Sequence, residues 1–257
     1  MYPELFGVVK SYGLMLAVSF AMGLWLSIRR GRRYDLSSET IMDLVFGVLV
    51  SSIIGVRLMF VLTHLGDFQP WYRVFYIWDG GLTLYGGIGL ATFTVWYMTR
   101  RRGIPFLVVA DIFSPGVILG IGLTRIGCFL AGCCFGSPTD CACGVVFPAG
   151  SSPFEQYGPV PLFPAQLFGS FGGFLVFGLL LVLERVSNYR GATFGRFLLL
   201  YGISRFTVDF FRYYEPEQIT ALGLSNNQWI SLGMMGGGLV VMIACRRSAA
   251  EREAGRG

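Results

Sequence analysis

The sequence predicts an all-α integral membrane protein with about seven transmembrane helices. Of its 257 residues, 54% are hydrophobic and 14% are charged, and the mean hydropathy is +0.61, which is far more apolar than a soluble domain of this length. Apolar runs long enough to cross a hydrocarbon core of about 30 Å follow one another with short breaks. Membrane lipid is therefore the expected solvent, and residues 1–248 are expected to form a single transmembrane domain.

The expected helices are apolar runs of about 20 residues, the length that spans a bilayer. They cover residues 5–28, 41–64, 82–99, 106–130, 162–183, 193–211 and 226–245. The first run is too long for a signal-peptide core and has no basic stretch before it, so it is predicted to stay as the first helix. The polar tail, residues 249–257, is expected to be frayed.

Basic residues mark every second loop and predict the orientation. Arginine clusters follow the first, third, fifth and seventh runs, within residues 29–33, 100–102, 185–190 and 246–247. The positive-inside rule makes these loops cytoplasmic, so the N-terminus and an arm at residues 131–161 lie outside and the C-terminus lies in the cytoplasm. This topology explains the net charge of +5 without a nucleic-acid partner.

One predicted helix carries a polar face. Tyr201, Arg205, Asp209 and Arg212 are spaced at i, i+4, i+8 and i+11, which places them on one side of a helix. An ionisable group at membrane depth costs about 2.5–3.5 kcal/mol, so it needs a partner or a task. One interpretation is that Asp209 neutralises an arginine and the set only joins helices.

Three other ionisable residues also lie inside apolar runs. Arg125 has no acid near it in the sequence, and together with the arginines of the polar face it leaves excess positive charge near the outer interface. Guanidinium groups suit phosphate oxygens, so a phospholipid headgroup is the expected ligand. Arg57 and Asp111 are instead expected to pair with each other as a structural bridge. The glycine-rich segment 79–89 is expected to loosen the backbone beside a polar pocket.

Six segments resemble, in the same order, the signatures of the prolipoprotein diacylglyceryl transferase family. They are Ser11-Tyr12-Gly13-Leu14, Gly55-Val56-Arg57-Leu58, Asp79 to Gly89 with Tyr85, Gly86 and Gly87, Arg125 to Gly136, Pro164-Ala165-Gln166-Leu167-Phe168 and Tyr201 to Arg212. Gln228 also fits the pattern. The resemblance covers nearly the whole chain.

The resemblance implies an enzyme that moves the diacylglyceryl group of phosphatidylglycerol to the lipobox cysteine thiol of lipoprotein precursors and releases glycerol phosphate. It implies that Arg125 and Arg205 hold and polarise the phosphate, while Asp209 and Arg212 fix Arg205. Tyr12 and Tyr201 would hydrogen-bond the headgroup or the glycerol. Other residues that the family pattern places around the substrate are Gly86, Gly87, Cys128 and Gly136. No cofactor or metal is implied.

Three positions depart from the family pattern. Tyr85 stands where the family usually has histidine, Cys128 where it has asparagine, and Cys133 where it has glutamate. Tyrosine, with a pKa near 10, is a poor base at neutral pH, so Tyr85 either orients the lipid as a hydrogen-bond donor or serves packing. The acceptor thiol would be drawn toward thiolate by Arg125 and Arg205, so a strong base is dispensable.

Five cysteines gather at or beyond the outer end of the fourth helix. They are Cys128, Cys133, Cys134, Cys141 and Cys143. Disulfide bracing of the outer arm is the leading interpretation, with at least one thiol left free because the number is odd. A metal site, a redox role and apolar packing remain open alternatives. Two other functions also remain open: a divergent family member with a different acceptor or a thiol-redox role, and a non-enzymatic lipid-binding or transport protein.

Overall fold

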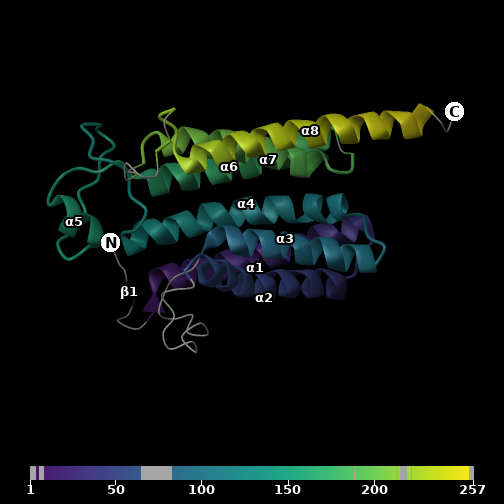
Figure 1. Ribbon diagram of the computed structural model, residues 1–257, viewed down its shortest axis with the longest axis horizontal. Helices are drawn as coiled ribbons and strands as arrows, with labels where there is room; N and C mark the ends of the chain where they lie inside the picture. The colour runs from purple at the N-terminus through teal and green to yellow at the C-terminus, as the bar shows by residue number, and fades with distance from the viewer. Residues whose placement is uncertain are drawn as a thin grey trace. The chain divides into compact units, whose positions relative to one another are not determined.

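The protein was analysed as a computed structural model that describes residues 4–5, 9–64, 83–187, 189–212, 214, 219–220 and 222–254. The helices are α1 (Ser11–Gly31), α2 (Ser38–Thr63), α3 (Leu84–Arg101), α4 (Phe106–Ala131), α5 (Ser152–Tyr157), α6 (Ala165–Val186), α7 (Ala192–Asp209) and α8 (Asn226–Ala254), with a short 3-10 turn, η1 (Arg32–Tyr34) (Figure 1). Two strands, β1 (Glu4–Leu5) and β2 (Val9–Lys10), pair antiparallel before α1. The contacts divide the chain into two compact units, residues 27–109 and residues 1–26 with 110–257.

Each predicted apolar run contains one long helix, so the helical fold class is confirmed. The predicted start of the first helix at residue 5 is wrong, because β1 and β2 precede the helix and α1 begins at Ser11. Apart from the end of α8, the other long helices lie within a few residues of their predicted bounds. At the other end of the chain, α8 continues through residues 249–254, which the sequence placed in the polar tail.

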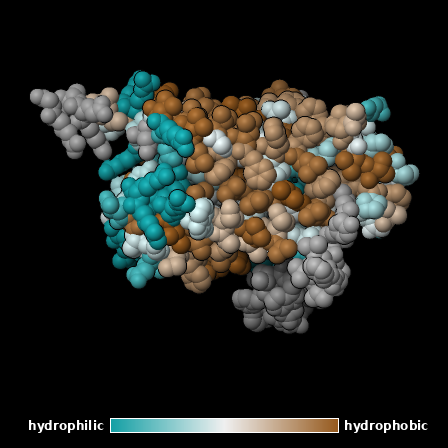
Figure 2. Space-filling model, turned by 180° about the vertical axis from the view of Figure 1, so that it is seen from behind, coloured by the Kyte–Doolittle hydropathy of each residue, from teal (hydrophilic) through white to brown (hydrophobic). Residues whose placement is uncertain are grey.

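Five helical segments are long and apolar enough to cross a membrane. They are Ser11–Tyr34, Ser38–Thr63, Phe106–Ala131, Ala165–Val186 and Asn226–Glu251. Large hydrophobic side chains remain exposed on these helices, among them Phe46 and Phe171. Hydrophobic residues cover most of the face drawn in Figure 2, and hydrophilic residues gather in a separate patch. The protein is therefore a multi-pass membrane protein, since such a surface is suited to lipid.

Glycines allow α2 and α3 to pack closely within residues 27–109. A Cβ on Gly55 would overlap the carbonyl oxygen of Gly86, and a Cβ on Gly86 would overlap that of Gly55. A Cβ on Gly87 would lie 2.6 Å from Cγ1 of Val56. The expectation that this glycine segment loosens the backbone is wrong for residues 84–89, which are helical, while residues 79–82 lie outside the described residues. These small residues instead let two helix backbones approach in lipid.

The second unit packs α1, α4, α6, α7 and α8 through small polar and glycine contacts. Thr124 donates a hydrogen bond to Ser19 at 3.1 Å, joining α4 to α1. Ser170 donates to the carbonyl oxygen of Gly122 at 2.8 Å, joining α6 to α4. Close packing of Gly195 against Gly238 brings α7 and α8 together. Hydrogen bonds of this kind hold helices in an apolar solvent, where no polar group can bond to water.

Asp111 anchors the start of α7. Its buried carboxylate accepts hydrogen bonds from the backbone N–H of Gly191 at 2.6 Å and of Phe194 at 2.8 Å. A carboxylate at a helix N-terminus satisfies free N–H groups and interacts favourably with the helix dipole. Asp111 therefore has a structural task within its own unit, and its pairing with Arg57 stays a prediction.

Gly86→Ala is expected to destabilise the protein by about 1–3 kcal/mol, because the new methyl group overlaps the backbone of α2. Gly89→Ala is the matched control on the same helix, since no atom lies within 4 Å of the position its Cβ would take. The control should leave stability unchanged or raise it by up to about 1 kcal/mol through helix propensity. Unfolding by denaturant titration in detergent measures both, and equal effects would contradict the packing argument.

Candidate functional site

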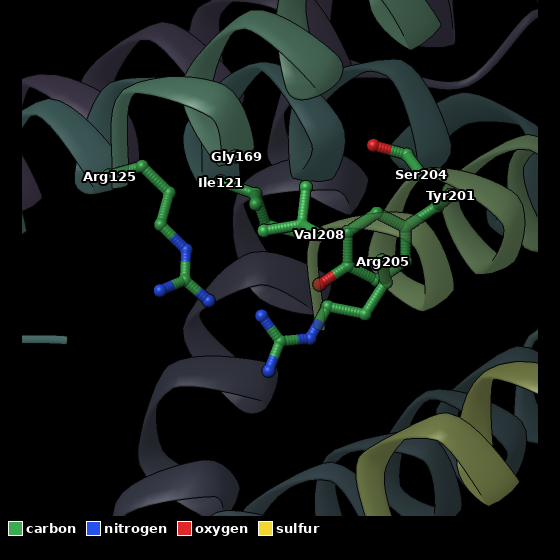
Figure 3. Close-up of a pocket in the computed structure, with 7 residues that line it drawn as sticks. All are labelled: Ile121, Arg125, Gly169, Tyr201, Ser204, Arg205 and Val208. Atoms are coloured by element: carbon green, nitrogen blue, oxygen red, sulfur yellow. The ribbon is translucent and has the colours of Figure 1, made fainter. Parts of the chain in front are cut away.

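A pocket lined by two arginines lies among α4, α6 and α7, all in one compact unit. Its lining residues are Ile121, Arg125, Gly169, Tyr201, Ser204, Arg205 and Val208. Arg125 comes from α4 and Arg205 from α7, and their guanidinium groups extend into the same space (Figure 3). The fold therefore brings together two cations that are 80 residues apart in the sequence.

Arg205 is fixed by a buried carboxylate one helical turn away. Its Nη2 lies 3.0 Å from Oδ1 of Asp209, whose side chain is fully buried, whereas the Arg205 side chain is 16% exposed. The Asp209 oxygens make no hydrogen bond among the described residues, so the contact with Arg205 is an ion pair without hydrogen-bond geometry. The structure thus places Asp209 where it can position Arg205.

Tyr214 is a further partner of Arg205 that the sequence did not single out. Arg205 Nη2 donates to the Tyr214 hydroxyl at 3.5 Å, and Asn227 Nδ2 donates to the same oxygen at 3.0 Å. Burial raises the pKa of Tyr214, so the phenol stays neutral at ordinary pH. A neutral hydroxyl orients the guanidinium without cancelling its charge.

Arg125 keeps its charge uncompensated within the described part of the chain. Its side-chain carbons pack against Gly169, where an added Cβ would lie 3.5 Å from Cδ. No ion pair or hydrogen bond of its guanidinium is found among the described residues. The donors of Arg125 are therefore available to a ligand in the pocket.

Arg212 adds a third guanidinium to this region. Its charged group lies over the ring of Tyr214, 5.6 Å from the centroid, and its backbone forms an isolated bridge with Gly136. Three arginines and one aspartate leave a net positive charge in this part of the unit. An anion with several oxygens, such as a phosphate ester, is the ligand that matches this charge and the forked geometry of guanidinium donors.

Gly136 joins three segments next to the arginines. Its N–H donates to the carbonyl oxygen of Phe163 at 2.9 Å, and Ser137 donates to that of Phe211 at 3.2 Å. A Cβ on Gly136 would lie 2.6 Å from both carbonyl oxygens. Only glycine fits here, so this position holds the turn after α4 against the segments that border α6 and α7.

Two glutamines of the family pattern serve the scaffold. Gln166 is fully buried and donates to the carbonyl oxygen of Cys133 at 2.7 Å. Gln228 accepts from the N–H of Ser225 at 2.8 Å, while Ser225 Oγ accepts from the N–H of Gln228 at 3.2 Å. This reciprocal pair is a capping box that begins α8.

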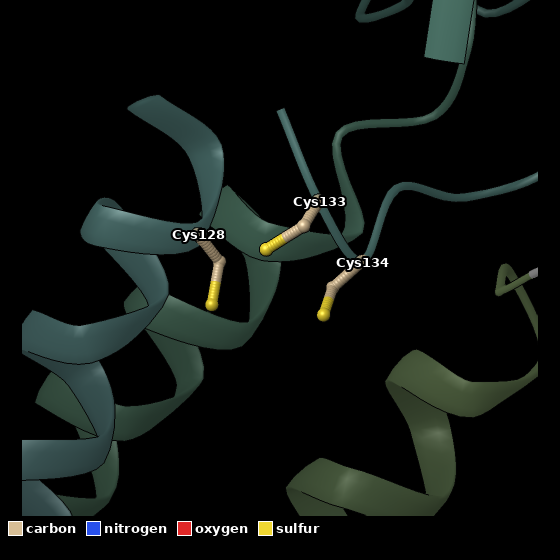
Figure 4. A group of neighbouring side chains, drawn as sticks. All are labelled: Cys128, Cys133 and Cys134. Carbon is tan, nitrogen blue, oxygen red and sulfur yellow. The ribbon is translucent and has the colours of Figure 1, made fainter. Parts of the chain in front are cut away.

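The five cysteines at and beyond the end of α4 form one disulfide and one thiol cluster. Cys141 and Cys143 are bonded, and Cys128, Cys133, Cys134 and Cys245 are free. The expectation of a disulfide in the outer arm is confirmed for this pair, and so is the expectation of a free thiol. The Sγ atoms of Cys128, Cys133 and Cys134 all lie within 4.8 Å of one another (Figure 4).

The thiol cluster lies within electrostatic reach of the arginines. Hydrogen bonds from Cys128 and Cys133 hold the pKa of Cys134 well below its usual range, and the guanidinium groups of Arg212 and Arg125 lower it further. The hydrogen bonds with Cys128 and Cys134 raise the pKa of Cys133. The fold thus places the sulfur of Cys134 where two neighbouring thiols and two guanidinium groups act on it.

The remaining predicted residues lie in different places. Tyr201 lines the arginine pocket and stacks on Phe197 with ring centroids 5.7 Å apart. Tyr12 is in the first turn of α1, and its Cα would lie 3.4 Å from a Cβ on Gly127 of α4. Tyr85, Gly86 and Gly87 begin α3 and belong to the other compact unit; the Tyr85 side chain is exposed.

Sequence reasoning missed several residues of the pocket. Ser204 and Val208 follow Tyr201 at i+3 and i+7, so the helical period that selected Arg205 contained a signal for them. Gly169 and Ile121 are contributed by other helices, and Tyr214 lies beyond the end of α7. No local pattern marks these residues, because tertiary packing alone brings them to the site.

The chain is similar to known proteins over almost its full length. A family model described as prolipoprotein diacylglyceryl transferase matches residues 4–244. A protein of Pseudoalteromonas atlantica named phosphatidylglycerol–prolipoprotein diacylglyceryl transferase is 35% identical over 252 residues, covering 93% of this chain and 86% of that protein. One of the same name from Photobacterium profundum is 35% identical over 234 residues, 88% of this chain and 83% of that protein. A phosphatidylglycerol–prolipoprotein diacylglyceryl transferase 2 of Clostridium perfringens is 30% identical over 240 residues, with 93% and 92% covered.

Asp209→Asn is expected to lower the free energy of unfolding by about 3 kcal/mol, because it removes a buried charge partner of Arg205 at nearly constant volume. Asp43→Asn is the control, because it breaks the 2.6 Å ion pair with Arg102. The Asp43 side chain is 56% exposed and the Arg102 side chain 35%. That exposed pair should contribute less than about 1 kcal/mol. Chemical unfolding in detergent compares the variants, and a similar small loss in both would refute the buried ion pair's importance.

Proposed function

The chain belongs to the prolipoprotein diacylglyceryl transferase family, and we propose that its arginine pocket moves the diacylglyceryl group of phosphatidylglycerol to the thiol of a lipoprotein precursor. The relatives compared above are named as enzymes of this reaction. Their names favour a transferase over a non-enzymatic lipid-binding or transport protein. One observation supports the site's place in the reaction: Arg125 and Arg205 face a common pocket.

The reaction needs a group that accepts developing negative charge. The acceptor thiol releases its proton to solvent, and its sulfur attacks the glyceryl carbon that carries the phosphate ester. A carbon–sulfur bond forms, the carbon–oxygen bond to phosphate breaks, and glycerol phosphate leaves with the electron pair. Because the phosphate gains negative charge as it leaves, preformed donors around it lower the barrier.

Arg125 and Arg205 are the residues proposed to hold that phosphate. Arg125 has donors without a partner in the described residues, and Arg205 is oriented by Asp209 and Tyr214. Two fixed guanidinium groups in a site of low dielectric stabilise the departing phosphate more strongly than water does. In this account Asp209 is a positioning residue, and Arg212 adds positive charge nearby.

Other predicted residues take supporting roles in the proposal. Tyr201 hydrogen-bonds the headgroup or glycerol from the pocket wall, and Tyr12 does so from α1. Cys128 lies one turn beyond Arg125 on α4, and Gly136 keeps the turn after α4 narrow. Tyr85 donates a hydrogen bond to the lipid from the start of α3, where Gly86 and Gly87 permit the close packing on α2.

We propose seven membrane crossings in the inner membrane, with the N-terminus and the active site facing outward and the C-terminus in the cytoplasm. The five apolar helical segments together with α3 and α7 would make the seven crossings. At the end of α3, Arg100 lies over Trp96 at 5.6 Å and Arg101 over Tyr97 at 5.2 Å. Such aromatic and basic pairs are typical of a membrane interface, which supports a crossing by α3.

Replacing either pocket arginine is expected to abolish most of the transferase activity. Arg125→Gln and Arg205→Gln should each lower kcat/KM by about 10²–10³, the usual effect of removing one donor to a developing anion. The assay uses the full chain in detergent, phosphatidylglycerol and a peptide with a free lipobox cysteine, and it measures the diacylglyceryl thioether by mass spectrometry. Arg101→Gln, an exposed arginine of α3, is the control and should retain activity.

A folded Arg125→Gln variant with normal kcat/KM would overturn the assignment of this pocket. A wild-type chain that binds phosphatidylglycerol but forms no thioether would instead favour a different acceptor or a lipid-binding role.

Tyr85→Phe is expected to lower kcat/KM by about tenfold, the loss of one hydrogen bond to a group that gains charge. Phenylalanine keeps the aromatic ring and removes only the hydroxyl group, so the variant tests the proposed hydrogen bond alone. Tyr97→Phe on the same helix is the control, because its hydroxyl bonds to Arg101 at 3.0 Å, away from the start of α3. Unchanged activity of Tyr85→Phe would assign this residue to packing.

A further inference from the structure

The cluster of Cys128, Cys133 and Cys134 has no task in phosphate binding. Their three Sγ atoms lie within 4.8 Å of one another, and none of the three is in a disulfide. Cys128 is on the last turns of α4, while Cys133 and Cys134 follow its end. Figure 4 shows the three sulfur atoms directed toward a shared space.

The convergence of two adjacent cysteines depends on a strained backbone. Adjacent residues of an extended chain direct their side chains to opposite sides. Cys134 instead has φ of 62°, a left-handed conformation that is uncommon for residues other than glycine. Such a conformation costs about 1–3 kcal/mol and persists only where the surroundings impose it. The left-handed conformation of Cys134 therefore directs its sulfur back toward the other two sulfurs, at a cost in conformational energy.

Buried hydrogen bonds hold this turn in place. The N–H of Cys133 donates to the carbonyl oxygen of Cys128 at 3.0 Å. The carbonyl oxygen of Cys133 accepts from the fully buried Gln166 at 2.7 Å. Gly136, two residues after Cys134, is bonded to Phe163. The three thiols are thus arranged by the fold and do not sit on a free loop.

The surroundings of the cluster suit bound thiolates. Arg125 precedes Cys128 by one helical turn on α4, and Arg212 pairs through its backbone with Gly136, two residues after Cys134. These cations offset the negative charge that three thiolate ligands bring to a metal ion. Cys128 is buried, whereas Cys133 and Cys134 are partly exposed, which leaves one side of the cluster open.

We propose that Cys128, Cys133 and Cys134 bind one zinc ion and that the open fourth position of the ion takes the thiol of the lipoprotein precursor. Zinc–sulfur bonds are about 2.3 Å, so ligand sulfurs in a tetrahedral site are about 3.8 Å apart, which the cluster accommodates. Three protein ligands with one open position are typical of catalytic zinc. An all-sulfur ligand set selects a soft metal over calcium or magnesium.

The acceptor part of this inference rests on the proposed function. A thiol that binds zinc is deprotonated, and its proton passes to solvent. The bound sulfur then attacks the glyceryl carbon, the carbon–oxygen bond breaks, and glycerol phosphate leaves toward Arg125 and Arg205. The thioether product is neutral and binds zinc weakly, so it departs. Zinc would thereby supply the thiolate in a chain that has Tyr85 where a histidine base is usual in the family.

Metal binding is tested on the full chain in detergent, reduced, stripped of metal and then dialysed against zinc. Mass spectrometry should find one zinc per chain, and cadmium should produce thiolate-to-metal charge-transfer absorption. Cys133→Ser and Cys128→Ser should each lower zinc affinity by at least tenfold, while Cys245→Ser, the free cysteine of α8, should not. The helical circular dichroism of each variant, compared with that of the wild type, verifies that it is folded.

Reduced wild-type protein that takes up no zinc overturns the proposal, as does zinc uptake that is equal in folded Cys133→Ser. A disulfide between two cluster cysteines that persists under reductant overturns it as well.

The acceptor role is tested by the thioether assay on stripped and zinc-restored protein. Activity should fall at least tenfold on stripping and return with zinc. Full activity of the stripped protein overturns the role of zinc and leaves the transferase proposal standing. A protein that binds one zinc but forms no thioether overturns the proposed function and with it the acceptor role.

Discussion

The ion pair between Arg205 and Asp209 is the interaction on which the proposed site depends. A charged guanidinium group inside a membrane protein is costly, and Asp209 lowers that cost for Arg205 with a buried carboxylate 3.0 Å away. This carboxylate also fixes the direction of Arg205, so that its remaining donors reach the pocket that Arg125 lines. This part of the unit holds three arginines and one aspartate, and the excess positive charge favours an anionic lipid over a neutral one.

The surrounding fold explains how these charges are held without water. Asp111 bonds the first N–H groups of α7, so the helix that carries Arg205 begins at a fixed point. Ser170 joins α6 to α4 beside the wall of the pocket. Gly136 lets the turn after α4 approach the end of α7, which brings the thiol cluster near the arginines. Small residues and internal hydrogen bonds replace the solvent that a soluble enzyme would use.

The sequence predicted the features that hydrophobicity and helical period encode. These include the long helices, the polar face of α7 with Arg205 and Asp209, and the family, which the comparisons confirm. The predictions were wrong where one local composition is compatible with two different structures. Residues 4–10 are apolar enough to continue α1, yet residues 4–5 and 9–10 pair as strands. A glycine such as Gly86 is compatible with a flexible backbone or with a close contact between helices. Only the position of Gly55 in the structure decides for the close contact.

The convergence of Cys128, Cys133 and Cys134 could not be predicted from the sequence either, because it depends on the left-handed backbone of Cys134, which no sequence pattern indicates.

The central claim is that Arg125 and Arg205 bind one phosphate, and a structure of the protein with bound phosphatidylglycerol tests it most directly. The account predicts lipid phosphate oxygens within about 2.7–3.2 Å of guanidinium nitrogens of both arginines. A phosphate bound elsewhere, with Arg205 turned only toward Asp209, would contradict it.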